Sequence, residues 1–173
     1  AVTYLLNLGH RDIVFIAGPA HFSTTASRAN GYRRGFLEMD VPYREEMVIH
    51  GDTTYDGAYD ATRELLDKQT AFSAIFASND VSAFGVMEAV REHGLRIPGD
   101  VSVVGFDDIP QAAHVHPPLT TVQQPLEEMG RTATRMLLER ISNPQLPIER
   151  VELPTELVLR QSCCPAKSLT EGD

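Results

Sequence analysis

Three polar side chains that could hold a small molecule follow apolar runs of this sequence. Arg28, Asn79 and Asp107 each come after such a run. A carboxylate accepts hydrogen bonds from hydroxyl groups, and guanidinium and amide groups donate them. If the runs are parallel strands, their carboxyl ends share one edge of the sheet, where open α/β sheets bind ligands. The set therefore predicts a site for a small polar molecule such as a sugar.

Each of these residues also has a purely structural interpretation. Asn79 could only cap the following helix, because Asn is preferred at that position. Arg28 could be a solvated helix residue, and one of the neighbours Asp107 and Asp108 could only form a turn. The shared position of the set favours a binding site, although it does not settle the role of any single member.

Motifs for catalysis and for nucleotide binding are missing from the sequence. No G-x-G-x-x-G follows an apolar run, no P-loop lysine occurs, and Ser23 and Ser27 lie outside any nucleophile-elbow context. His114 and His116 form a pair two residues apart, which is a weak metal signal, and we expect them to be exposed or packing residues. We therefore expect no catalytic residue, no metal ion, no cofactor and no enzymatic activity.

Expected strands and helices alternate along most of the chain. We expect helices at residues 1–8, 25–39, 55–68, 81–93 and 125–141, buried strands at 13–17, 74–77 and 101–105, and a weaker strand near 47–49. This order predicts an α/β fold, a doubly wound parallel sheet with helices on both faces. Shorter extended pieces are expected at 119–122, 148–153 and 157–159.

The charge balance argues against direct contact with nucleic acid. The chain has 15 basic and 24 acidic residues, a net charge of −9, which repels a phosphate backbone. No apolar stretch is long enough to span a membrane, and the first residues lack the basic start of a signal peptide. Cys163 and Cys164 are adjacent and are expected to be free thiols. We therefore expect a cytoplasmic protein that binds no membrane.

Short motifs occur in a fixed order along the chain. They are LGHRDI at 8–13, AGP at 17–19, GY at 31–32, ASND at 77–80, GLRIPGDVSVVGFDD at 94–108 and PLTTVQQP at 118–125. Each motif is modest, but the ordered set resembles the effector-binding part of LacI/GalR transcriptional regulators over about residues 1–160. The resemblance implies the fold of periplasmic binding proteins, with an effector cleft between two subdomains.

The resemblance also implies which residues line that cleft. The positions of Arg28, Asn79 and Asp107 contact the small molecule in this family, and the positions of Thr24, Thr53 and Gln124 often line the same cleft. Many members carry an aromatic ring where this sequence has Thr53. Stacking on a ligand would then fall to Phe22 or Tyr55, or to a part of the fold that this chain lacks.

The same resemblance divides the chain into parts. Residues 1–122 and 154–162 match the C-terminal effector-binding subdomain, and residues 123–153 match a helix and a strand that complete the N-terminal subdomain. We expect this second segment to lack its sheet neighbours here, and residues 163–173 to form a polar tail. The DNA-binding head would lie outside the chain.

Homodimers are usual in this family, and the helix expected at 81–93 is apolar on two faces. Val81 and Phe84 lie beside the stripe that suits the sheet, so they are candidates for a dimer interface. Phe84 would equally suit the core.

The sequence thus predicts a sugar-like effector-binding domain of a LacI/GalR-type regulator that contacts operator DNA only through the missing head. The main alternative is a periplasmic-type solute-binding protein that serves a transporter. A small α/β enzyme is a more distant alternative.

Overall fold

Six strands form one sheet in the order β2-β1-β3-β4-β5-β6 in the computed structural model, which describes residues 1–167. The strands are β1 Ile13–Ala17, β2 Val48–His50, β3 Ala74–Ala77, β4 Ser102–Asp107, β5 Thr120–Gln123 and β6 Glu156–Val158. Strands β1 to β5 are parallel, which confirms the predicted sheet, whereas β6 pairs with β5 in the antiparallel direction. The sheet is therefore mixed at the β6 edge.

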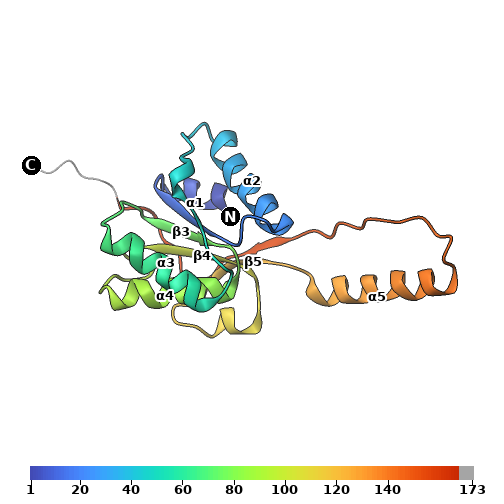
Figure 1. Ribbon diagram of the computed structural model, residues 1–173. Helices are drawn as coiled ribbons and strands as arrows, with labels where there is room; N and C mark the ends of the chain where they lie inside the picture. The colour runs from blue at the N-terminus through green and yellow to red at the C-terminus, as the bar shows by residue number, and fades with distance from the viewer. Residues whose placement is uncertain (168–173) are drawn as a thin grey trace, which may run out of the picture.

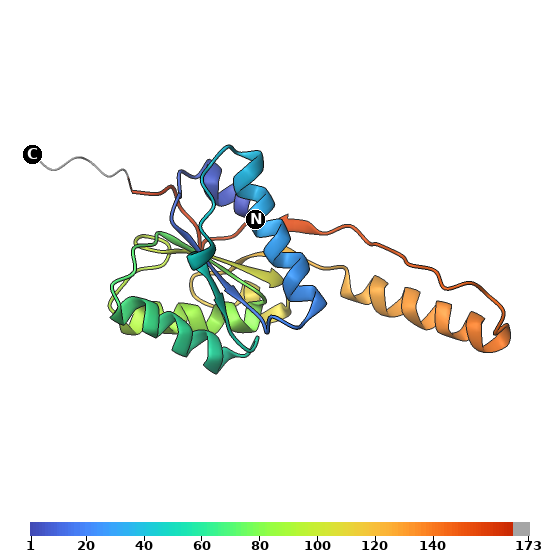
Figure 2. The same cartoon turned by 45° about the horizontal axis from the view of Figure 1, so that its top comes forward.

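Helices cover both faces of this sheet. Figures 1 and 2 show α1 and α2 on one face and α3 and α4 on the other. Their bounds are α1 Val2–Asn7, α2 Ser23–Glu38, α3 Tyr55–Asp67 and α4 Asp80–Glu92. Alternate strand residues face the two layers, so Phe15 and Phe76 pack with α1 and α2, while Val14 and Ile75 pack with α3 and α4. This double coverage explains why β1 and β3 are buried along their whole length.

Local capping and close packing place the helices of the second layer. The Thr54 hydroxyl accepts a hydrogen bond from the Gly57 amide at 3.0 Å and so caps α3. A Cβ at Gly85 in α4 would lie 2.1 Å from the carbonyl oxygen of Tyr55, so only glycine lets the two helices approach this closely. Two short 3-10 helices, η1 Glu45–Met47 and η2 Pro110–Ala113, complete the connections.

One helix and the segment after it stand away from the body. Helix α5, Leu126–Ser142, has no buried residue, and Figure 1 shows it projecting with the returning segment. The extended piece expected at 148–153 forms no strand, since residues 147–155 are neither helix nor strand. A strand needs a partner for its backbone hydrogen bonds, and no described strand lies beside this segment. The apolar side chains of α5 and of the segment after it are exposed, among them Met129, Leu137, Leu138, Ile141 and Ile148.

The chain returns to the body after β6. The Ser162 hydroxyl is buried and donates a hydrogen bond to the Val103 carbonyl oxygen at 2.6 Å. The Cys164 amide donates to the Ser102 hydroxyl at 3.1 Å, so the first residues of the expected polar tail lie against β4. Residues 168–173 of that tail lie outside the described residues. Within residues 1–167, no helix is both long and apolar enough to cross a lipid bilayer.

Candidate ligand-binding site

The predicted polar residues lie where β3 and β4 end. Asn79 follows β3 as the N-cap of α4, Asp107 is the last residue of β4, and Arg28 reaches toward it from α2. Because β3 and β4 are paired neighbours, their ends bring Asn79 and Asp107 to the same edge of the sheet. This is the arrangement that the sequence predicts for a ligand site.

Arg28 and Asp107 form an ion pair at this edge. A guanidinium nitrogen of Arg28 lies 3.6 Å from Asp107 Oδ1, and the two side chains are only 20% and 25% exposed. Burial lowers the pKa of Arg28 and raises the pKa of Asp107, and in each case the partner's charge opposes the change. The partly dry surroundings therefore strengthen electrostatic contacts to any polar group that enters.

Gln124 completes this group of side chains. Its amide nitrogen donates a hydrogen bond to Asp107 Oδ1 at 2.6 Å, and its backbone amide donates to the Asp107 carbonyl oxygen at 3.3 Å. The second carboxylate oxygen of Asp107 has no such bond from Gln124, so it is placed to accept a hydrogen bond from a ligand hydroxyl.

The backbone around Asp107 is unusual. Asp107 has φ 118° and Asp108 has φ 58°, and both values lie in the left-handed region that favours glycine. Side chains alternate between the faces of a strand, so Phe106 and Asp107 would normally point apart. Arg28 nevertheless contacts both residues, at the point where Asp107 has left the regular strand conformation.

Asn79 has two structural bonds as well as its place at this edge. Its Oδ1 accepts a hydrogen bond from the Ser82 amide at 2.7 Å, which confirms the helix-capping interpretation. Its Nδ2 donates to the Thr53 carbonyl oxygen at 3.0 Å, and Thr53 has φ 69°. The NH₂ group carries two hydrogens, so one of them remains available for a ligand. Asn79 therefore holds Thr53 at this edge of the sheet.

The remaining predicted residues differ in where they lie. Thr24 is exposed in the first turn of α2, and Phe22 precedes that helix with 45% of its surface exposed. Tyr55 lies instead beside α4, where burial and the charges of Glu88 and Glu92 raise its pKa. The Tyr55 carbonyl oxygen lies close to Gly85 of α4, and 38% of the surface of Tyr55 is exposed, so Phe22 and Tyr55 are both exposed rings.

Three further residues near the site were not among the residues predicted to bind the ligand. The Arg28 guanidinium lies 4.0 Å from the centroid of the Phe106 ring, a cation–π contact. The Ser78 hydroxyl is buried and has no hydrogen-bond partner within residues 1–167. Asp80 is fully buried and binds the backbone amide of Ile109 at 2.9 Å. Their position directly beside Asn79 and Asp107 was the only signal in the sequence.

The described residues offer no evident metal site. Within residues 1–167, no group of three His, Cys, Asp or Glu side chains is placed to hold a metal ion, and His114 and His116 are exposed. Arg28 borders a hollow of about 400 Å³ whose wall also includes Tyr32, Phe76 and Phe106. Arg28 and the three aromatic rings line this hollow, whereas Asp107, Asn79 and Gln124 are not among its lining residues.

Comparison with known proteins gives the family. Residues 2–163 match the family of periplasmic binding protein-like domains. The HTH-type transcriptional regulator CelR of Thermobifida fusca is 41% identical over 94% of this chain and 48% of its own length. The HTH-type transcriptional repressor PurR of Photorhabdus laumondii is 40% identical over 92% of this chain and 47% of its own length. The chain thus spans about half the length of these curated relatives.

Solved structures give the same result. A CelR–cellobiose complex is 41% identical, with TM-score 0.89, over 94% of this chain and 50% of that one. A LacI family regulator from Enterococcus faecium with bound ribose is 33% identical, with TM-score 0.86, and the match covers 96% of this chain and 61% of that one. A lac repressor dimer bound to operator is 31% identical, with TM-score 0.85, and the match covers 94% of this chain and 56% of that one. The chain belongs to the periplasmic binding protein-like domain family, and its relatives are LacI-family transcriptional regulators.

Proposed function

We propose that this chain is the sugar-binding effector domain of a LacI-type transcriptional regulator. The observation that carries the proposal is the half-buried group of Arg28, Asp107 and Gln124 at the carboxyl ends of the strands. The bound cellobiose and ribose in two structural relatives support a sugar as the ligand. An effector of this kind acts by binding one conformation of the whole protein more tightly than another.

Sugar hydroxyls match the donors and acceptors of this group. Asp107 accepts from hydroxyl groups, while Arg28 and the second N–H of the Asn79 amide donate to hydroxyl oxygens. Phe22 or Tyr55, both of them exposed, would supply the ring that stacks on the sugar, because Thr53 occupies a position where many family members carry an aromatic side chain. Thr24 and Thr53 would lie beside the ligand without being its main hydrogen-bonding residues.

The complete protein would place the sugar between two subdomains. Residues 1–122 and 154–162 would form one side, and residues 123–153 would belong to the other. The exposed apolar residues of α5, such as Leu137 and Ile141, support this division because they lack partners within the described chain. Operator DNA would be bound by a separate head, consistent with the net charge of −9.

The complete protein would also be a homodimer, and α4 offers the surface. Val81 is 42% exposed, whereas Phe84 is partly buried against the core shared by α3 and α4. Val81 is therefore the stronger candidate for the interface, and Phe84 would contribute only its exposed part.

Two other functions fit less well. A solute-binding protein of a transporter shares the fold, but the relatives of this chain are transcriptional regulators. The same relatives are not enzymes, and we infer that this chain has no enzymatic activity. A regulator of transcription would act in the cytoplasm.

Titration calorimetry of the complete gene product that contains this chain tests the proposal. The titrants are cellobiose and ribose, followed by a panel of other mono- and disaccharides, with glycerol as a control for weak hydroxyl binding. We expect one sugar to bind saturably and to change the affinity of the protein for its operator. Absence of saturable binding across the panel would reject the proposal.

A further inference from the structure

A second carboxylate, that of Asp80, is buried next to the turn that carries Asp107. Its Oδ1 accepts a hydrogen bond from the Thr121 hydroxyl at 2.5 Å, and its Oδ2 accepts from the Ile109 amide at 2.9 Å. Asp80 and Thr121 are both fully buried. A Cβ at Gly105 would lie 2.3 Å from Asp80 Oδ1, so glycine makes room for this carboxylate. Asp80 thus joins the turn after β4 to the middle of β5.

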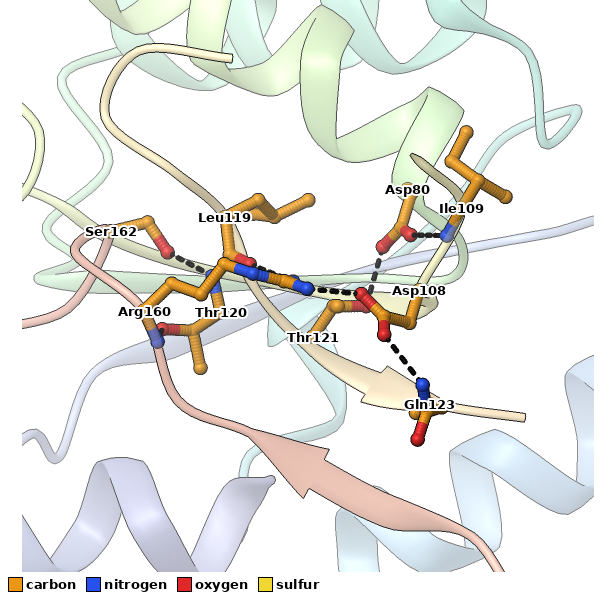
Figure 3. Close-up of polar contacts among 9 residues, drawn as sticks. All are labelled: Asp80, Asp108, Ile109, Leu119, Thr120, Thr121, Gln123, Arg160 and Ser162. Carbon is orange, nitrogen blue, oxygen red and sulfur yellow. Dashed lines mark hydrogen bonds and ion pairs between the residues drawn. The ribbon is translucent and has the colours of Figure 1, made fainter. Parts of the chain in front are cut away.

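A third carboxylate, that of Asp108, joins the same turn to two strand ends. Figure 3 shows the Arg160 side chain reaching across to Asp108, with Gln123 on the other side. Arg160 donates to Asp108 Oδ1 at 2.6 Å, and Gln123 Nε2 donates to Asp108 Oδ2 at 2.9 Å. The Asp108 and Arg160 side chains are only 9% and 18% exposed.

Arg160 also holds β5 from the other side. Its guanidinium donates to the Leu119 carbonyl oxygen at 2.8 Å, and its backbone amide donates to the Thr120 hydroxyl at 2.9 Å. Gln123 ends β5, and Arg160 follows β6 by two residues. These two strands lead to and from the projecting α5 segment (Figure 1).

We propose that Asp80 and Asp108 are positioning residues that couple the sugar contact at Asp107 to the strands β5 and β6. Asp107 and Asp108 are consecutive, so any ligand that pulls on Asp107 displaces the carboxylate that ties both strand ends together. The strained backbone at both residues means that the turn keeps its shape only while these side-chain bonds hold it. The proposal rests on the sugar-binding function proposed above. It states that sugar binding at Asp107 affects α5 through the strands β5 and β6.

Ordinary stabilisation of the fold is the competing explanation, and a matched variant separates the two. Asp100 forms a similar carboxylate pair, with Arg96 at 2.9 Å and with Lys167, but it lies before β4 and away from the Asp107 turn. Asp100→Asn therefore removes carboxylate charge pairs without touching the turn, although the Arg96 and Lys167 side chains are more exposed than that of Arg160. Thr121→Ser and Thr121→Val form a second matched pair, because only serine retains the hydroxyl that Asp80 binds.

The test combines amide hydrogen exchange with sugar titration. In the 173-residue chain without sugar, Asp108→Asn should speed exchange of the amides in β5 and β6 about tenfold, whereas Asp100→Asn should leave them within about twofold. In the complete gene product, Asp108→Asn and Thr121→Val should weaken sugar binding about tenfold, and Thr121→Ser should bind like the wild type.

The outcomes separate this proposal from the proposed function. Equal effects of Asp108→Asn and Asp100→Asn would overturn the positioning role, as would a Thr121→Val protein that binds sugar like wild type. If no sugar binds the wild type, the proposed function fails. The exchange comparison, which needs no ligand, then decides whether Asp108 holds the two strands.

Discussion

The guanidinium of Arg28 lies over the ring of Phe106, 4.0 Å from its centroid, and the same guanidinium pairs with the next residue, Asp107. One side chain of α2 is thus held by two consecutive residues of β4. An aromatic face and a carboxylate restrict the orientation of Arg28 before any ligand arrives. Such preorganisation reduces the entropy lost when a ligand binds.

Replacing Phe106 therefore tests how Arg28 is oriented. Phe106→Leu removes the aromatic face but keeps an apolar side chain, and we expect it to weaken sugar binding about threefold to tenfold. Phe106→Tyr keeps the ring and should bind like the wild type. Titration calorimetry measures both variants, and equal affinities for leucine and tyrosine at this position would contradict the orienting role.

The backbone of Asp107 gives a stability prediction. Alanine at φ 118° remains strained, whereas glycine adopts this conformation freely. Both substitutions remove the carboxylate, so we expect Asp107→Gly to be more stable than Asp107→Ala by about 1 kcal/mol. Urea unfolding measures the difference. At Asp100, where φ is not positive, alanine should be the more stable of the two, and the same order at both positions would contradict the prediction.

The pKa of Asp80 predicts a pH effect on stability. Burial raises this pKa, the charges of Asp107 and Asp108 add to the increase, and hydrogen bonds from Thr121 and Ile109 oppose it. A carboxyl group whose folded pKa exceeds its unfolded value is destabilising when ionised, and this cost disappears as the pH falls through the folded pKa toward 3.8.

The comparison with Asp80→Asn isolates that effect. The asparagine cannot ionise, so the stability of the wild type relative to this variant should increase as the pH falls from about 7 to about 4.5. Urea unfolding at several pH values measures it. If the stability of the wild type relative to Asp80→Asn stays constant or decreases as the pH falls over this range, the pKa of Asp80 is not raised.

Val81 gives the prediction for assembly. Val81 is 42% exposed on α4, so Val81→Glu should leave the fold intact while it places a charge in an apolar interface. We expect the mass of the complete gene product in light scattering to fall from dimer to monomer. Leu37→Glu, at an exposed position of α2, is the control and should remain dimeric. A dimeric Val81→Glu protein would place the interface elsewhere.

Much of the fold could be predicted from local patterns. The buried strands β1 and β3 are short, continuous apolar runs, and Asn79 and Gly94 mark the ends of α4 as their residue types suggest. The segment at 148–153 forms no strand although its apolar composition suits one, because a strand also needs a neighbour. Local sequence carries no information about whether that neighbour is present.

The site could be predicted only in part. Strand order placed Arg28, Asn79 and Asp107 at one edge, because the position of a residue after a strand determines which edge it occupies. The close approach of Tyr55 to α4 depends on helix packing, which sequence spacing does not give. Arg160 lies 52 residues beyond Asp108, and nothing in the sequence near either residue indicates that they form a pair.

Sugar titration of Asp107→Ala in the complete gene product tests the central claim most directly. The account predicts that binding weakens by about 2–4 kcal/mol, about 30-fold to 1000-fold, because Arg28 and the ligand hydroxyls lose their acceptor. The Asp100→Ala protein should bind like the wild type. An Asp107→Ala protein that binds the sugar with undiminished affinity would contradict the account.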